Sequence, residues 1–401
     1  MIDKYYNGVI EQVVSGIGNV EHNSILVRYS NDFSIWDLES VNHYKDQSDI
    51  FFTCHEFSYN KIAEAYEPYL GLIRQMFHRY CSGTLEEFME ECDVYKLQRP
   101  VFESYFEKGF CERTEQILID EVEYEQERMR NSIVTMLQKL SEIRPVVIVL
   151  NRFQLASKST MQLSNSLLQV KNKNIGIVLG VNDVQSIPEF AHEEWDAICE
   201  SMDDRNMVYH IGNAGRNMEP DVMDYYSDYE SDDGYRKLNN LVYFLDFDQA
   251  DHHLSKIERR IKFDNFTISE KKHYQLLLLQ IMVSVLQRDI AKALESCEDL
   301  EKLQDQEKEG AFYYNFWMAT SYMYLGKLEE AMIYVQKAKE CGEALGDDFL
   351  VFRAELLKAQ NQMSGWCNIF FCAQDIEISD KLIEKLNAYH YKNHLAHIYI
   401  Y

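Results

Sequence analysis

The 401-residue chain has few helix-breaking residues and little positive charge. It contains 5 prolines and 16 glycines, and only 40 lysines and arginines against 66 aspartates and glutamates. Few prolines and glycines, together with long stretches of helical periodicity, predict a protein in which helix dominates. A formal net charge of −26 disfavours unspecific binding to nucleic acid or to anionic lipid, because both are negatively charged. We expect no nucleic-acid or membrane partner; the acidic balance favours solubility, and a basic partner is the alternative.

Cysteine pairs and long apolar runs are also missing. The 9 cysteines are odd in number, irregularly spaced and form no CxxC, which indicates neither a disulfide framework nor a zinc ribbon. No run approaches the roughly 20 apolar residues that cross a bilayer. The first residues, MIDKYYNGVIEQVV, lack the basic start and apolar core of a signal peptide. These absences predict a cytoplasmic protein with reduced thiols.

The longest strongly β-branched apolar run is VVIVL at 146–150, which follows a proline and ends at polar residues. Such a run predicts a strand buried on both faces, at the centre of a parallel sheet. The other predicted strands are 24–29, 49–54, 175–181 and, more weakly, 207–211. Strands that alternate with helices over short connections predict a doubly wound α/β domain, which we expect to close near residue 215.

Helices are predicted between these strands. One begins within 33–38, with Asn31 or Asp32 placed to cap it, and residues 61–135 are mainly helical. The charged run 121–130 is predicted to be a solvated helix surface. The predicted buried side chains are Leu70, Ile73, Met76 and Phe77 in the first long helix, and Leu163, Leu167 and Leu168 in a helix over 161–170.

A tract rich in acid and tyrosine, 219–234, separates the α/β domain from the last third of the chain. Its composition predicts a surface loop, and an acidic aromatic docking segment is the alternative. An amphipathic helix is predicted over 238–261. Its apolar positions at helical spacing are Leu241, Phe244, Leu245, Ala250, Leu254 and Ile257.

The last third has the spacing of tetratricopeptide-type repeats. In 314–342 that spacing is carried by Ala319, Tyr322, Gly326, Ala331, Val335 and Ala338, where small residues let two helices approach and the glycine turns the chain. Residues 288–293 mirror 326–331, with 38 residues between Ala293 and Ala331. A third unit, 351–387, is irregular, and 394–401 resembles the first helix of a further hairpin.

The stretch 145–169 resembles the STAND class of P-loop ATPases, in which an AAA-like nucleotide module precedes a repeat-built sensor. Gln154, Ala156 and Ser159 match the family pattern after the apolar strand, and Tyr66-Glu67-Pro68 resembles its entry to the helix after the second strand. The resemblance covers roughly 22–400. It implies a signalling protein whose effector, such as a GGDEF-type diguanylate cyclase or a helix-turn-helix domain, would follow Tyr401.

The catalytic residues of that family are absent here. A GxxxxGK[ST] cradle wraps phosphates in glycine amides, neutralises them with lysine and binds Mg²⁺ through a hydroxyl. The first predicted strand is followed by no glycine or lysine, and the acidic pair expected after 146–150 is replaced by Asn-Arg. The degenerate positions are Ser30, Asn31, Asp32, Ser34, Asn151 and Arg152. We therefore expect no ATP hydrolysis, cofactor or metal.

Three other groups of residues suggest chemistry. Cys54-His55-Glu56 suggests a thiol with a base, but adjacent residues of a strand point apart, which favours a structural role. His252-His253 with nearby aspartates suggests a metal site, but no third ligand is evident, and a solvated helix is favoured. The aromatic residues Tyr314, Trp317, Tyr322 and Tyr324 suggest partner binding, although repeat packing is the more ordinary explanation.

The sequence thus predicts an α/β P-loop-like parallel-sheet domain followed by an all-α tetratricopeptide-type domain. The expected divisions are an N-terminal lead (1–21), the degenerate α/β domain (22–215), an acidic loop and helical linker (216–268) and repeats (269–401). The leading hypothesis is a non-catalytic sensor or scaffold that binds a protein or peptide through its repeats. The alternatives are a nucleotide-binding switch and an interaction platform unrelated to ATPases.

Overall fold

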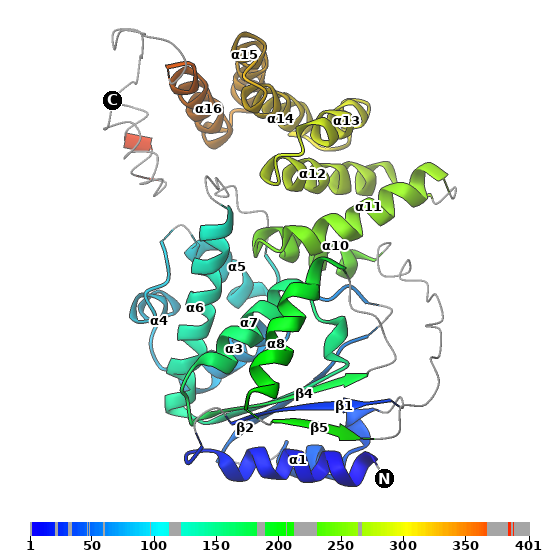
Figure 1. Ribbon diagram of the computed structural model, residues 1–401. Helices are drawn as coiled ribbons and strands as arrows, with labels where there is room; N and C mark the ends of the chain where they lie inside the picture. Colours follow the sequence, from blue (N-terminus) through cyan, green and yellow to red (C-terminus); the bar gives the residue numbers. More distant parts are fainter. Residues whose placement is uncertain are drawn as a thin grey trace. The chain divides into compact units, whose positions relative to one another are not determined.

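The computed structural model (Figure 1) describes most of the chain. The described residues are 2–20, 23–30, 34–45, 47, 49–58, 61–96, 98–111, 122–182, 189–205, 207–211, 231–263 and 267–366, with 384, 385 and 388. The chain divides into two compact units, Met1–Gln249 and Ala250–Tyr401. Several predicted features lie outside the described residues: Asn31, Asp32, most of the acidic tract and the C-terminal helix at 394–401.

The first unit contains a five-stranded parallel sheet with the strand order β2-β3-β4-β1-β5. The strands are β1 (Ser24–Tyr29), β2 (Phe51–Glu56), β3 (Val146–Asn151), β4 (Ile175–Asn182) and β5 (Val208–Ile211). All five predicted strands are confirmed, although β2 begins two residues later than predicted. Every residue of β3 and β4 is buried, as expected for strands with helices on both faces.

One face of the sheet is covered by α1 (Ile2–Gly16) and α2 (Glu39–Tyr44). Helix α1 places Tyr6, Ile10 and Val13 against the sheet with no exposed surface. Its close approach requires glycine in β4, because a Cβ on Gly176 would lie 2.6 Å from Val13 Cγ1. The N-terminal segment is therefore a packed layer of the α/β unit.

The opposite face carries α3 (Tyr69–Tyr80), α6 (Val122–Ile143), α7 (Lys158–Gln169) and α8 (His192–Asp203), as Figure 1 shows. Two shorter helices, α4 (Leu85–Glu91) and α5 (Arg99–Lys108), complete this side, and single 3₁₀ turns occur at η2 (Phe153–Leu155) and η3 (Glu189–Ala191). The predicted buried faces of α3 and α7 are confirmed.

Two helix predictions in this unit need correction. The segment after β1 is a 3₁₀ turn, η1 (Ile35–Asp37), followed by the six-residue α2, and the residue that caps η1 is Ser34. The charged start of α6 is only partly solvated: Glu123 and Glu127 are exposed, whereas Met129 is buried and Gln126 Nε2 donates to the carbonyl of Leu245 at 2.6 Å. Packing against neighbouring segments covers one side of that charged run.

The second part of the chain is a series of helices with short connections. They are α10 (Asp232–Tyr243), α11 (Phe247–Phe263), α12 (Glu270–Leu286), α13 (Ile290–Glu301), the 3₁₀ turn η4 (Gln304–Gln306), α14 (Gly310–Tyr324), α15 (Leu328–Leu345) and α16 (Asp348–Trp366). The boundary between the two compact units falls inside α11. Ala293, Ala319, Ala331 and Ala338 have no exposed surface, as expected where helices pack closely.

One turn geometry recurs along these helices. Leu245, Arg288 and Gly326 all have left-handed backbones, with φ of 66°, 63° and 71°. In each case the next amide donates to the carbonyl five residues earlier, which is the Schellman ending of a helix. A fully buried alanine follows each turn after five residues: Ala250, Ala293 and Ala331. The predicted correspondence of 288–293 with 326–331 is confirmed.

The predicted single helix over 238–261 is wrong. Leu245 breaks it into α10 and α11, because its left-handed backbone ends the first helix. Its predicted apolar positions are all buried. Sequence periodicity missed the break because leucine, unlike glycine, is no signal for a left-handed residue.

Candidate functional site

The carboxyl ends of β1, β2 and β3 lie at one edge of the parallel sheet, where an α/β protein usually binds its ligand. Ser30 follows β1 and is half-buried, Glu56 ends β2, and Asn151 and Arg152 end and follow β3. Ser34 caps the 3₁₀ turn after β1. These residues are called the strand-end site below; the predicted positions Asn31 and Asp32 lie outside the described residues.

The centre of the strand-end site is the carboxylate of Glu56. Its Oε2 accepts hydrogen bonds from Ser34 Oγ at 3.0 Å and from the amide of Ile35 at 3.2 Å. Its Oε1 pairs with Arg152 at 3.1 Å, and the two side chains are only 10% and 19% exposed. An internal carboxylate thus takes the amide and the cation that could otherwise receive a bound anion.

Asn151 lies deeper and is closed in from two sides. It has no exposed surface, and its Oδ1 accepts a hydrogen bond from the hydroxyl of Tyr29 at 2.7 Å. A Cβ on Gly180 would lie 2.7 Å from the same oxygen and would clash with the hydroxyl of Tyr6. The end of β3 is therefore closely packed by neighbouring protein groups around the Asn151 side chain.

Residues that follow β3 fix the backbone at the carboxyl ends of β3 and β4. The side chain of Gln154, which is fully buried, accepts a hydrogen bond from the amide of Asn182 at 3.2 Å. Arg152 has φ 53° and ψ 42°, a left-handed backbone that is unusual for a residue with a side chain. Its guanidinium pairs with Glu56, so Arg152 acts as a structural cation.

The residues Cys54 and His55 show no catalytic pairing. Burial raises the pKa of the Cys54 thiol to about 12, so the reactive thiolate is not formed at neutral pH. Burial lowers the pKa of His55 to about 4, and its Nε2 lies 3.5 Å from Glu67 Oε1. The ring of His55 also contacts that of Phe57 edge-on, with centroids 4.5 Å apart.

A half-buried carboxyl group that the sequence did not reveal, that of Glu64, belongs to the same segment as Glu67, the partner of His55. Burial and the adjacent Glu67 raise the pKa of Glu64 to about 7, and Asn240 Nδ2 donates to Glu64 at 2.9 Å. The backbone amide of Glu64 in turn donates to Glu67 Oε2 at 3.1 Å. Two glutamates three residues apart before a proline carry no recognisable signal, so only the tertiary structure shows that they are half-buried together.

The histidines of α11 do not form a metal site. Burial lowers the pKa of His253 to about 3 and that of His252 to about 4, and the two rings contact each other edge-on. Asp248 pairs instead with Lys158 at 2.6 Å. Over the part of the chain that the structure describes, no group of three or more histidine, cysteine or acidic side chains could hold a metal ion.

In the second unit, the predicted aromatic residues separate into two kinds. Tyr314 and Tyr322 are half-buried around Tyr334, whose ring stacks on that of Tyr322 with centroids 5.6 Å apart and meets that of Tyr314 edge-on at 6.3 Å. We call these three residues the tyrosine face. Trp317 is only 7% exposed and belongs to the core, whereas Tyr324 is 43% exposed below the guanidinium of Arg288.

Lysines border the tyrosine face. Lys337 Nζ lies 4.9 Å from the ring centre of Tyr334, and Lys327 Nζ lies 5.6 Å from that of Tyr322. Amphipathic aromatic rings flanked by cations suit contact with a polypeptide that has acidic and apolar groups. The aromatic candidates predicted from the sequence included Tyr314 and Tyr322 but not Tyr334, whose ring contacts both.

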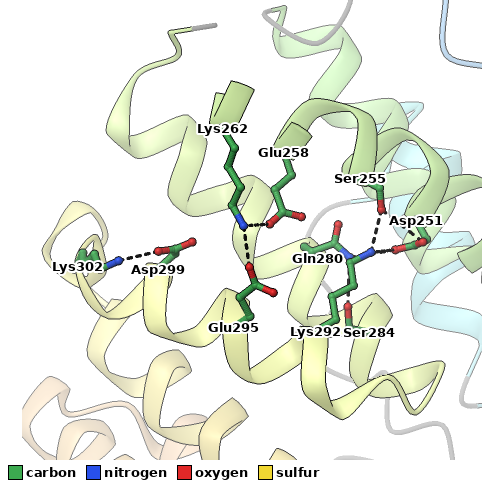
Figure 2. Close-up of polar contacts among 10 residues, drawn as sticks. All are labelled: Asp251, Ser255, Glu258, Lys262, Gln280, Ser284, Lys292, Glu295, Asp299 and Lys302. Atoms are coloured by element: carbon green, nitrogen blue, oxygen red, sulfur yellow. Dashed lines mark hydrogen bonds and ion pairs between the residues drawn. The ribbon is translucent and has the colours of Figure 1, made fainter. Parts of the chain in front are cut away.

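Ion pairs connect α11 to α13 in the same unit, as Figure 2 shows. Lys292 Nζ bonds to Asp251 Oδ1 at 2.6 Å and to Ser255 Oγ at 2.8 Å, and Gln280 of α12 donates to the same aspartate at 3.0 Å. One turn farther along α13, Glu295 pairs with Lys262 at 2.9 Å. We call these contacts the polar ladder; they fix neighbouring hairpins in register.

Comparison with known proteins identifies no family for this chain: no protein-family model matches it, and neither does any curated protein. Among the described helices, none combines the length and apolar character needed to cross a membrane.

Proposed function

We propose that this protein is a non-catalytic scaffold or sensor: an α/β unit derived from a nucleotide-binding module but closed to nucleotide, with a helical unit that binds a protein or peptide. The observation that carries the proposal is the Glu56 carboxylate in the strand-end site. It engages the Ile35 amide, the Ser34 hydroxyl and the Arg152 guanidinium together. A nucleotide phosphate could bind here only if it displaced this carboxylate from its partners. Because both groups are negatively charged, they would also repel each other.

Two further observations support the closed site. The family carboxylate is replaced by Asn151, whose oxygen is already bonded to Tyr29. Among the described residues between β1 and β2, the helical elements are a 3₁₀ turn and the six-residue α2, and neither is a long helix with its amino end at a phosphate position. Without the P-loop lysine and the acidic pair after the central strand, we expect neither magnesium nor a γ-phosphate to be stabilised here.

Binding of a polypeptide by the helical unit is supported by the tyrosine face and the lysines around it. Stacked helical hairpins form a continuous surface, and half-buried tyrosines contribute large contact areas at little entropic cost. Tyr314, Tyr322 and Tyr334 all pack against the buried core of the helical unit, which supports a tyrosine face that is organised before a partner binds.

Calorimetric titration of the full chain with ATP and Mg²⁺ tests the first half of the proposal. We expect no heat of binding. Micromolar binding would overturn the closed site and favour a nucleotide-controlled switch, and loss of that binding in Asn151→Ala would place the nucleotide at the strand-end site.

A peptide array tests the second half, with wild type, Tyr322→Ala and Tyr334→Ala as probes. Tyr209→Ala, which alters a 39% exposed tyrosine on β5, is the matched control. We expect a set of peptides that the control retains and both tyrosine-face variants lose. Equal binding of every peptide by all four proteins contradicts a role for this face.

A further inference from the structure

A cleft of about 370 Å³ runs along the outer edge of β2, in the α/β unit and apart from the strand-end contacts described above. Its walls come from Trp36 in η1, Lys45 after α2, and Arg79 and Tyr80 at the end of α3. Its floor is β2 itself, from Phe51 to Cys54. We call it the edge cleft.

The main chain of β2 is open toward the edge cleft. β2 is the terminal strand of the sheet, and within the described ranges it pairs only with β3. The amide of Phe51 donates to the carbonyl of Pro145, which precedes β3, at 2.7 Å. The amide of Phe57 donates to the carbonyl of Asn151, the last residue of β3, at 3.1 Å. Successive residues of a strand point their backbone groups to opposite sides, so those of Phe52 and Cys54 face the cleft and can receive a further strand.

The charge of the edge cleft is opposite to that of the whole protein. Of the described residues that line it, Lys45 and Arg79 are cationic and none is acidic, although 66 of the 401 residues of the chain are acidic. Lys45 Nζ lies 5.9 Å from the ring centre of Trp36, and the Arg79 guanidinium lies 5.4 Å from that of Tyr80. Each cation thus stands beside an aromatic wall, and Trp36 is 49% exposed.

We propose that the edge cleft binds an extended acidic segment of a partner protein, which adds as a strand to β2. Main-chain hydrogen bonds to Phe52 and Cys54 would supply affinity. Alternate side chains would divide between the two faces of the strand, with apolar ones against Trp36 and Tyr80 and acidic ones near Lys45 and Arg79. This site is independent of the helical unit, so it goes beyond the function proposed above.

The test uses the full chain and a fluorescent peptide of about seven residues that alternates glutamate and valine, a length matched to β2. Binding is followed by anisotropy at low salt, where attraction between charges is least screened. Three further peptides serve as competitors: one with lysine in place of glutamate, one with scrambled order and one N-methylated at alternate residues. We expect binding of the acidic peptide, and about tenfold or more weaker competition by the lysine and N-methylated peptides.

The protein variants separate the cleft from general surface charge. Lys45→Glu with Arg79→Glu should weaken binding of the acidic peptide about tenfold or more, whereas Lys4→Glu with Lys139→Glu, the same change at exposed positions of α1 and α6, should leave it nearly unchanged. Circular dichroism verifies that both double variants are folded. The proposal is overturned by undetectable binding at millimolar peptide, by equal loss in the two double variants, or by an N-methylated peptide that binds as well as its parent.

Discussion

Asn151→Asp introduces a carboxylate at the end of β3, where the P-loop ATPase pattern has one, and we expect it to destabilise the protein without creating a magnesium site. Asn151 has no exposed surface and accepts a hydrogen bond from Tyr29. Magnesium needs oxygen ligands at about 2.1 Å in octahedral geometry and keeps several waters. The hydrogen bond from Tyr29 and the close approach of the Gly180 backbone, where a Cβ would lie 2.7 Å from Asn151 Oδ1, disfavour such a hydrated ion.

The size of the effect follows from the charges around the site. Arg152 is already paired with Glu56 at 3.1 Å, so the new carboxylate would be buried without a cation. An uncompensated buried charge costs about 3–5 kcal/mol, and a hydrogen bond from Tyr29 to a charged oxygen recovers about 1.5–3 kcal/mol. We therefore expect the free energy of unfolding to fall by about 2 kcal/mol at pH 8.

The dependence on pH identifies the cause. Burial raises the pKa of a carboxyl group, so the new aspartate would be protonated in the folded state at a pH where it is ionised in the unfolded state. The destabilisation should therefore shrink as the pH is lowered from about 8 to about 5. Urea denaturation followed by tryptophan fluorescence measures it at both values, with and without about 10 mM MgCl₂.

Asn131→Asp is the matched control, because it makes the same chemical change at an exposed position of α6. It should alter stability by less than about 0.5 kcal/mol. If Asn151→Asp is as stable as wild type at pH 8, or if magnesium stabilises it, the site accepts a solvated ion and the inference of a closed strand-end site is wrong.

Three other perturbations test the packing. Burial raises the pKa of Glu64 to about 7, so its proton is lost more easily from the unfolded state and the stability of the wild type should fall as the pH rises from about 4.5 to 7. Glu64→Gln should remove roughly 3 kcal/mol of this loss. Equal dependence of the unfolding free energy on pH in wild type and variant, in denaturation series from about pH 5 to 8, would contradict this role. Gly176→Ala should cost at least about 2 kcal/mol, because its Cβ would lie 2.6 Å from Val13; an unchanged Tm would mean that α1 does not hold this position. Lys292→Met should lower the stability of the helical unit by about 1–3 kcal/mol, because it leaves Asp251 half-buried without its cation. Lys302→Met, which removes the exposed ion pair with Asp299, is the control and should change stability by less than about 1 kcal/mol. Equal effects of the two substitutions on hydrogen exchange would contradict a role for the polar ladder.

The strands of the first unit could be predicted because their signal is local. Residues 146–150 combine β-branching with continuous apolar character, and both properties act over a single buried strand. The register of the helical hairpins was also visible, since a small residue must recur wherever two helices approach. The turn at Leu245 was not, because a leucine gives no sign of a left-handed backbone.

The strand-end site shows the limit of such reasoning. The sequence shows that the lysine and acidic pair of the P-loop pattern are not present, but it does not show that Glu56 engages the groups at this site. Glu56 is 22 residues from Ser34 and 96 from Arg152, and their meeting depends on the sheet that brings the strand ends together.

The amino-acid sequence contains no GxxxxGK[ST] motif, and by itself it determined a parallel sheet and a following series of helices, because periodicity, propensity and residue type act at short range. Only the tertiary structure decided that α1 lies on glycines of β4, that Glu56 occupies its own strand-end site and that a cationic cleft follows the open edge of β2. These features depend on which distant segments become neighbours, and that is set by packing across the whole unit.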